Sequence, residues 1–279
     1  MVTERTLFLC LVLALPLFHF YSALVDQITA SAHVPVSLVS RSKEWKTRAS
    51  KCEQIHSTAD SQYMKSQSGE DAMLLTWFSR LCGGTYIELG ALDGVKFSNS
   101  HVFHYTRQWK GVLIELMEYN FNLLTENRKD ELATIHAGVC DQKSLLHYYG
   151  KGAIGGIYEF SAPSFRKMWW GDVTLDDPKV KTIECDTMDS LLKISTNETY
   201  FDFLSLDVEG AEMTVLKSID FDRVGFGIVL AEADEHNPLK NLAMRHYLQE
   251  KGYDFLMEYE RSYWWVNKDF HNIYGDVIY

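Results

Sequence analysis

Short apolar runs alternate with helically spaced segments along most of the chain. The runs are bounded by Gly or Asp and cover Thr85–Leu89, Val112–Glu115, Ala133–Val139, Phe201–Asp207 and Gly227–Ala231. Helical spacing is found between them, in Ala72–Leu81, Tyr119–Arg128, Ala211–Ile219 and Leu242–Lys251. Buried parallel strands are continuous apolar runs, and crossover helices join them. The pattern therefore predicts an α/β fold with one doubly wound, mostly parallel sheet and helices on both faces.

Two segments depart from this alternation. Residues 145–178 are rich in aromatic residues and glycine, and we expect a hairpin and loop insertion beside the site. Within it, Trp169 and Trp170 suit either stacking on a ligand or a small satellite core. Residues 7–25 form a run of 19 residues without a charge, long enough to span a bilayer as a helix. We interpret this run as a transmembrane signal anchor, although Ala30-Ser31-Ala32 also suits cleavage of a signal peptide.

The anchor sets the expected domain organisation. A short tail covers residues 1–6, the anchor 7–25, a polar stem 26–61 and the folded domain 62–279. The net charge of -11 argues against a nucleic-acid partner, which requires clustered basic residues. Four cysteines lie outside the anchor and none forms a CxxC pair, which disfavours a zinc site. They fit two disulfides in an oxidising compartment, or four buried thiols.

The sharpest chemical signal is the strand and turn at residues 85–94. Gly90 and Gly94 allow a tight turn and close backbone approach to a ligand. Their spacing differs from the GxGxxG of dinucleotide folds and suits a nucleoside without a pyrophosphate. Glu88 and Asp93 suit a ligand with a cationic amino-acid end, while an ordinary strand-to-helix turn is the alternative.

Three further strand ends carry acids. Glu115 ends the next strand, 25 residues after Gly90, where an acid binds ribose hydroxyls in doubly wound sheets. Asp141 follows the third strand and either bonds an adenine amine or caps a turn. Asp207 and Glu209 leave a later strand together, where carboxylates are costly unless solvated or paired. They suit a ligand ammonium group, a general base or a divalent cation.

Four segments resemble the FkbM family of methyltransferases between about Ser66 and Leu256. They are residues 66–71, 86–94, 186–191 and 206–212, the last reading Leu-Asp-Val-Glu-Gly-Ala-Glu. The resemblance implies a Rossmann-like methyltransferase fold and S-adenosyl-L-methionine as methyl donor. It also implies O-methylation of a hydroxyl on a sugar, macrolide or similar acceptor, and donor contacts from Gln67, Glu70 and Asp71.

The acceptor hydroxyl needs a base or a metal to become a good nucleophile. Base candidates are Asp207, Glu232 and His236, because residues 231–236 follow a strand and reach the same rim. His236 is alternatively a surface loop residue. Asp207 with Glu209 or Glu232 suits a hard cation, but we do not favour a required metal.

An anchored member of this family most resembles a Golgi glycan or hexose O-methyltransferase. We therefore expect a single-pass Golgi or endoplasmic reticulum protein with a lumenal domain, or a secreted protein if the anchor is cleaved. The sequon at Asn197 supports the lumenal side. The bias of basic residues toward the stem favours the opposite orientation. The expected partners are a glycan or small hydroxylated acceptor and the membrane, and the sequence indicates no oligomeric state.

Two rival interpretations remain. Some anchored relatives resemble trafficking or scaffold proteins that keep the fold without catalysis, but Gly90, Gly94 and Asp207 are all present here. A nicotinamide-dependent oxidoreductase is disfavoured because the turn after the first predicted strand of the sheet, from Gly90 to Gly94, does not have the GxGxxG spacing.

Overall fold

The computed structural model describes residues 50–52 and 57–278. The predicted tail 1–6, the predicted anchor 7–25 and most of the predicted stem 26–61 lie outside these residues. Within the described ranges, no helix combines the length and the apolar character needed to cross a bilayer. The end of the stem segment is folded. There, β1 (Ser50–Lys51) pairs with β2 (Leu81–Cys82), a disulfide joins Cys52 to Cys82, and α2 (Ser57–Tyr63) follows.

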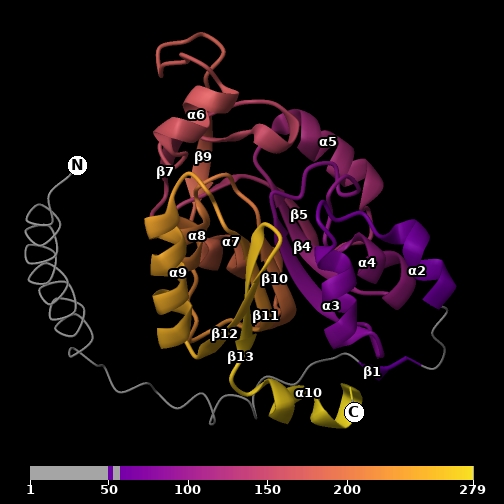
Figure 1. Cartoon of the computed structure of the whole chain (residues 1–279). Helices are drawn as coiled ribbons and strands as arrows, with labels where there is room; N and C mark the ends of the chain where they lie inside the picture. The colour runs from indigo at the N-terminus through magenta and orange to yellow at the C-terminus, as the bar shows by residue number, and fades with distance from the viewer. Residues whose placement is uncertain (1–49, 53–56, 279) are drawn as a thin grey trace, which may run out of the picture. The chain divides into compact units, whose positions relative to one another are not determined.

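A seven-stranded sheet of order β12-β13-β11-β10-β3-β4-β5 forms the centre of the domain (Figure 1). Its parallel strands are β3 (Thr85–Leu89), β4 (Lys110–Glu115), β5 (Ala133–His136), β10 (Tyr200–Leu206) and β11 (Gly225–Glu232). An antiparallel hairpin of β12 (Tyr253–Tyr259) and β13 (Ser262–Asn267) extends the sheet beside β11. The mostly parallel sheet that the sequence predicts is therefore confirmed.

Each face of the sheet packs against its own set of helices. On β4, Val112 and Ile114 enter one core and Leu113 enters the other, as alternation along a strand requires. The first core is covered by α7 (Met188–Ser195), α8 (Glu212–Lys217) and α9 (Pro238–Glu250). The second is covered by α3 (Glu70–Phe78), α4 (His101–Arg107), α5 (Glu118–Asn127) and α10 (Phe270–Ile278). The prediction of helices on both faces is thus confirmed.

The predicted strand Ala133–Val139 is wrong in one respect, because the chain divides it between two sheets. β5 ends at His136, and β6 (Gly138–Val139) pairs with β9 (Lys181–Asp186) in a separate sheet of order β6-β9-β7-β8. The disulfide between Cys140 and Cys185 joins the ends of β6 and β9. The backbone N–H of Ala137 still donates to the carbonyl of Glu115 on β4, and after it the chain pairs with β9 instead.

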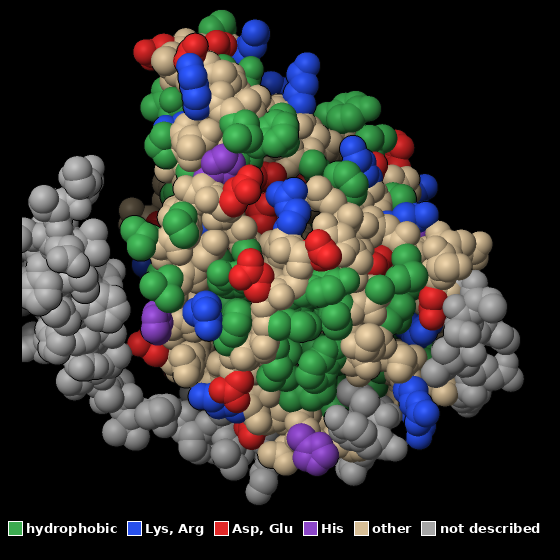
Figure 2. All heavy atoms as spheres, in the orientation of Figure 1, with side chains coloured by type: hydrophobic (Ala, Val, Ile, Leu, Met, Phe, Trp, Pro, Cys, Tyr) green, Lys and Arg blue, Asp and Glu red, His purple; other side chains and the backbone are tan. Residues whose placement is uncertain are grey.

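The predicted insertion contains the rest of this second sheet and a helix that the sequence pattern did not indicate. β7 (Ser144–Tyr149) and β8 (Gly156–Ile157) form the expected hairpin around a short 3-10 helix, η2 (Gly152–Ile154). After β8, α6 (Pro163–Trp169) packs Phe165 against Trp170 in a small third core. Figure 2 shows acidic and basic side chains interspersed over one face of the molecule, so the excess negative charge does not form one continuous patch there.

Candidate functional site

A cavity of about 200 Å³ opens at the carboxyl ends of β3, β4 and β10. Strand order reverses between β3 and β10, because the chain proceeds from β3 to β4 and β5 before it returns to β10 on the other side. Ligands of open α/β sheets bind at such a switch point. The cavity is lined by six of the residues predicted from the sequence: Gln67, Glu88, Gly90, Glu115, Asp207 and Glu209.

Gly90 lets the ends of β3 and β10 approach each other. Its φ is +78°, and a Cβ atom built there would lie 1.9 Å from the carbonyl oxygen of Asp207. The backbone N–H of Asp207 also donates to the carbonyl of Leu89 at 3.2 Å. Because the nearest atoms belong to the backbone of Asp207, a side chain at position 90 would push the ends of β3 and β10 apart.

The carboxylate of Glu88 accepts several hydrogen bonds from neighbouring residues. It accepts hydrogen bonds from the backbone N–H of Asn99 at 2.7 Å and from the hydroxyls of Ser98 and Ser100. Burial raises the pKa of Glu88, and the nearby Arg128 opposes that rise. These contacts fix the loop that leads into α4, so Glu88 shapes the cavity wall, and its predicted contact with a cationic ligand end stays a prediction.

Glu115 lies at the end of β4, in the position expected for a ribose contact. Its Oε2 accepts from the backbone N–H of Leu92 at 2.9 Å and its Oε1 from that of Met117 at 2.7 Å. Burial raises the pKa of Glu115 to about 7 despite these hydrogen bonds. Apolar side chains, among them Ile114 and Val139, line the same cavity. An acid with spare lone pairs beside apolar walls fits a nucleoside.

Asn99 offers an unused acceptor to the cavity. Its Nδ2 donates to the hydroxyl of Ser205 at 2.9 Å, while its buried Oδ1 has no hydrogen-bond partner among the described residues. Asn99 also borders a smaller hollow of about 20 Å³, where Glu70 and Glu232 lie with Asp207. A buried polar atom without a partner is costly, so this site favours a polar ligand.

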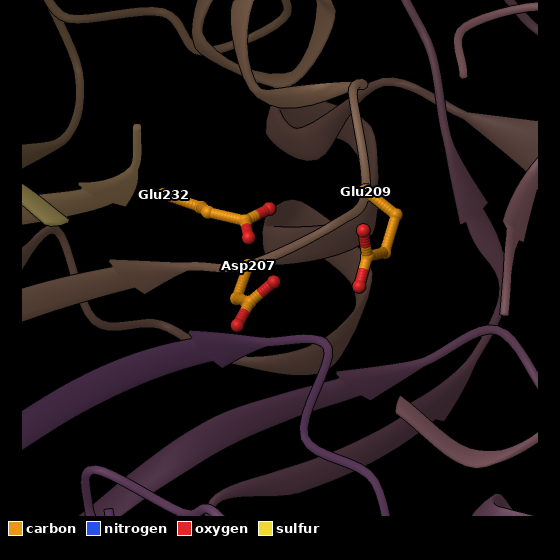
Figure 3. Close-up of side chains that lie close together, drawn as sticks. All are labelled: Asp207, Glu209 and Glu232. Carbon is orange, nitrogen blue, oxygen red and sulfur yellow. The ribbon is translucent and has the colours of Figure 1, made fainter. Parts of the chain in front are cut away.

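Three acids form a group that we term the carboxylate trio: Asp207, Glu209 and Glu232. They converge from the end of β10, the following loop and the end of β11 (Figure 3), with oxygens within 4.8 Å of one another. Although Asp207 is open to the cavity, surrounding protein limits its hydration and raises its pKa to about 7. The charges of Glu209 and Glu212 push the pKa of Asp207 in the same direction.

The pKa values of the other two members are also raised. For Glu209 the largest cause is again desolvation, followed by the charges of Glu232 and Glu212. For Glu232 it is burial, followed by the charge of Asp207. Three acids this close cannot all be ionised at neutral pH without added positive charge. The trio can therefore accept a proton or attract a cationic ligand.

A buried ion pair supports the loop that carries Glu209. Glu212 accepts from the backbone N–H groups of Val208 and Gly210, both at 3.2 Å, and its other oxygen pairs with Lys240. Glu209 has a φ of +53°, which a residue other than glycine rarely adopts. The ion pair and the two hydrogen bonds hold the loop in this conformation.

Arg261 is a site residue that the sequence interpretation missed. It lies between β12 and β13, lines the cavity, and its Nη2 donates to Glu232 Oε1 at 2.6 Å. No motif surrounds it, and 29 positions separate it from Glu232. The only available signal was its place in the turn of a hairpin beside the strand that ends at Glu232.

The insertion forms one wall of the cavity through residues 152–155, Phe165 and Trp169. The two neighbouring tryptophans differ. Trp170 is buried and donates from Nε1 to the carbonyl of Ile154 at 2.8 Å, whereas the side chain of Trp169 is 51% exposed. Trp170 thus belongs to the satellite core, and Trp169 remains free to contact a ligand.

His236 lies on the edge of this wall. Its Nδ1 is 3.1 Å from the hydroxyl of Ser164, and its ring meets that of Phe165 edge-on at 5.8 Å between centroids. It does not line the cavity itself. His236 therefore contacts the insertion, and its role as a base stays a prediction.

Four other predicted residues are not among those that line the cavity. The carboxylates of Asp71 and Asp93 accept from nearby backbone N–H groups and so stabilise local turns. Gly94 faces Arg128, whose Cγ would lie 2.5 Å from an added Cβ atom. Asp141 is exposed and follows the disulfide-bonded Cys140. Gly94 is thus a packing requirement of the turn.

Residues 88–255 match the family model of the methyltransferase FkbM domain, so the cavity belongs to a methyltransferase. Because this match covers more than half of the sequence, the chain belongs to the FkbM methyltransferase family. A search of curated protein sequences finds no significant match.

Solved structures with similar folds include several methyltransferases. An FkbM methyltransferase from Methylobacillus flagellatus aligns with a TM-score of 0.43, 12% identity and coverage of 74% of this chain. This chain spans 50% of the length of that protein. Precorrin-6y C5,15-methyltransferase from Geobacter metallireducens has a TM-score of 0.38 and 10% identity, with coverage of 74% and 93%. Aeropyrum pernix fibrillarin, solved with natively bound S-adenosyl-L-methionine, has a TM-score of 0.38 and 13% identity, with coverage of 72% and 75%.

Proposed function

We propose that this chain is an S-adenosyl-L-methionine-dependent O-methyltransferase that acts on a sugar hydroxyl of a glycan or glycoside in the secretory pathway. The observation that carries the proposal is the acidic cavity at the switch point of the sheet. Glu115 lies where a ribose is bound in such folds, and the carboxylate trio lies at the end of β10. A donor with a positive sulfonium, an ammonium group and a nucleoside matches this charge and shape.

The donor supplies a methyl group that the sulfonium already activates, so the protein must align the acceptor and remove its proton. Alignment of the reacting atoms contributes about 7–11 kcal/mol, and a positioned base contributes roughly 10²–10⁴-fold in rate. As the acceptor oxygen bonds to the methyl carbon, the carbon–sulfur bond breaks and its electron pair stays on sulfur. The acceptor proton passes to Asp207, a member of the carboxylate trio that lines the cavity beside Gly90.

Three features support a sugar acceptor and a secretory location. Trp169 exposes an aromatic face on the cavity wall, and such faces pack against the C–H groups of sugars. Disulfides persist in oxidising compartments, and this domain contains two, Cys52–Cys82 and Cys140–Cys185. Asn197 of the sequon is exposed in the loop after α7, where an oligosaccharide can be attached.

Donor binding is tested by calorimetry with the purified chain and S-adenosyl-L-methionine. We expect Gly90→Ala to abolish binding, because its Cβ would collide with the backbone of Asp207. Gly83→Ala is the matched control, since Gly83 also has a positive φ of +70° but nothing within 4 Å of an added Cβ. Glu115→Gln, which keeps the shape of the side chain, should weaken binding about 10-fold. Wild-type affinity in both site variants would show that the cavity does not bind the donor.

The acceptor is tested by mass spectrometry of glycans from cells with and without the protein. The proposal predicts glycan species heavier by one methylene group that disappear when the gene is removed. Re-expression of the wild-type chain should restore them, and re-expression of Gly90→Ala should not. Glycan profiles that do not change with the protein would rule out a glycan acceptor and leave donor binding as a separate question.

A further inference from the structure

Arg261 is tied to the end of β11 through both its backbone and its side chain. The backbone N–H of Ala233 donates to the carbonyl of Arg261 at 2.7 Å, and the guanidinium donates to Glu232 at 2.6 Å. Glu232 is 7% exposed, while the side chain of Arg261 is 56% exposed toward solvent and the cavity. The guanidinium is therefore held at the carboxylate trio although it is partly hydrated.

Arg261 is also the only basic residue among the residues described as lining the cavity. Lys240 is buried and pairs with Glu212 and Asp234, two acids outside the carboxylate trio. The charged groups that face the trio from surrounding elements are Glu70 of α3, Glu212 of α8, Asp234 after β11 and Arg261. All of them except Arg261 are acids, so Arg261 is the main source of positive charge at the trio.

The three members of the trio do not share Arg261 equally. Glu232 accepts its hydrogen bond, whereas no N–H or O–H group of the described residues donates to the side chains of Asp207 or Glu209. We propose that Arg261 is a positioning residue that holds Glu232 in place and supplies positive charge that favours the ionised form of Asp207, the form that takes the acceptor's proton. This inference rests on the proposed methyl transfer and assigns the proton step within it.

The proposal has an electrostatic consequence that a purely structural role would not produce. A unit charge near the trio stabilises its ionised forms, and Arg261 lowers the pKa of Asp207, Glu209 and Glu232 alike. Without that charge, the protons leave the trio at higher pH. Lysine at position 261 would keep the positive charge but lose the planar guanidinium. The Arg261→Lys variant should therefore keep most of the lowering of these pKa values.

The test is an NMR titration of the ¹³C-labelled side-chain carboxyl of Asp207 in the full-length chain, assigned with Asp207→Asn. No acceptor is needed, so the result does not depend on knowing the substrate. We expect Arg261→Gln to move the titration midpoint upward by about one unit or more. Arg261→Lys should stay within about half of that shift. Lys268→Gln, which removes a surface cation that pairs with Asp254, is the matched control and should leave the midpoint unchanged.

An unmoved midpoint in Arg261→Gln, or equal shifts in Arg261→Gln and Lys268→Gln, would overturn the assignment to Arg261. Equal shifts in Arg261→Gln and Arg261→Lys would also overturn it, because the effect would then follow the loss of the guanidinium and not of the charge. Donor affinity measured on the same samples separates the two proposals. A wild-type chain that does not bind the donor contradicts the proposed function, whereas the midpoints test Arg261 alone.

Discussion

Two pairs of acids line the same cavity and differ in what their oxygens contact. Glu88 and Glu115 accept hydrogen bonds from backbone N–H groups, and Glu88 also from hydroxyls, so both carboxylates hold the loops after β3 and β4, while Glu115 keeps lone pairs for the proposed ribose contact. The carboxylates of Asp207 and Glu209 accept none from the described residues and face one another instead. The partnered acids stabilise the walls of the cavity, whereas the carboxylates of Asp207 and Glu209 are free to accept a proton or bind a cationic group.

The largest expected effect tests the unpartnered pair. Asp207→Asn keeps the size of the side chain but cannot accept the proton, so turnover should fall by roughly 10²–10⁴-fold. The measurement is transfer of labelled methyl from the donor to glycans of cells that lack the protein. Asp254→Asn, an exposed substitution of the same kind on β12, is the control. Undiminished turnover in Asp207→Asn would remove Asp207 as the base.

The next largest effect is a difference in protein stability between substitutions in the two pairs of acids. Glu88→Ala leaves the donors of Ser98, Asn99 and Ser100 without their buried acceptor and should lower the free energy of unfolding by about 3 kcal/mol. Glu209→Ala removes no hydrogen bond and relieves repulsion, so unfolding should change by less than about 0.5 kcal/mol. Denaturant titration measures both. Equal losses of unfolding free energy in the two variants would contradict the difference between partnered and unpartnered acids.

The smallest expected effect is a pH dependence of opposite sign for rate and stability. Turnover should rise with pH through about 7, because the base must be ionised and the pKa of Asp207 is raised to about 7. A carboxyl group with a raised pKa in the folded state stabilises the fold at low pH, and this contribution is lost as pH rises through about 7. The melting temperature of the wild type should thus decline as the pH rises through about 7. The melting temperature of the Asp207→Asn variant should decline less over the same pH range. A melting temperature that rises over the same range would contradict the assignment.

Much of the fold could be predicted because it depends on local patterns. The apolar runs at Thr85–Leu89 and Phe201–Asp207 correspond to β3 and β10 within one residue. The strand expected over Ala133–Val139 breaks at Ala137, because Gly138 and Val139 pair with β9 in a second sheet, where a disulfide also joins Cys140 to Cys185. Such a change of partner depends on a segment about 45 positions away, which no short pattern indicates.

The site was predictable to the extent that strand ends converge on one edge of a sheet. This rule brought Glu88, Gly90, Glu115 and Asp207 to one cavity. It could not separate them by role, because a role depends on which donors lie within hydrogen-bond reach. It placed Asp141 at the same edge, although the redirected chain leaves that side chain exposed.

By itself, the sequence determined the succession of strands and helices and the acids at the strand ends, because local apolar spacing and turn residues encode both. Tertiary structure alone decided that Glu88 accepts hydrogen bonds from hydroxyls while Asp207 does not. It also decided that Arg261 donates a hydrogen bond to Glu232. The physical reason is that electrostatic and hydrogen-bond interactions depend on distance in space, and folding brings these partners together from segments that are far apart along the chain.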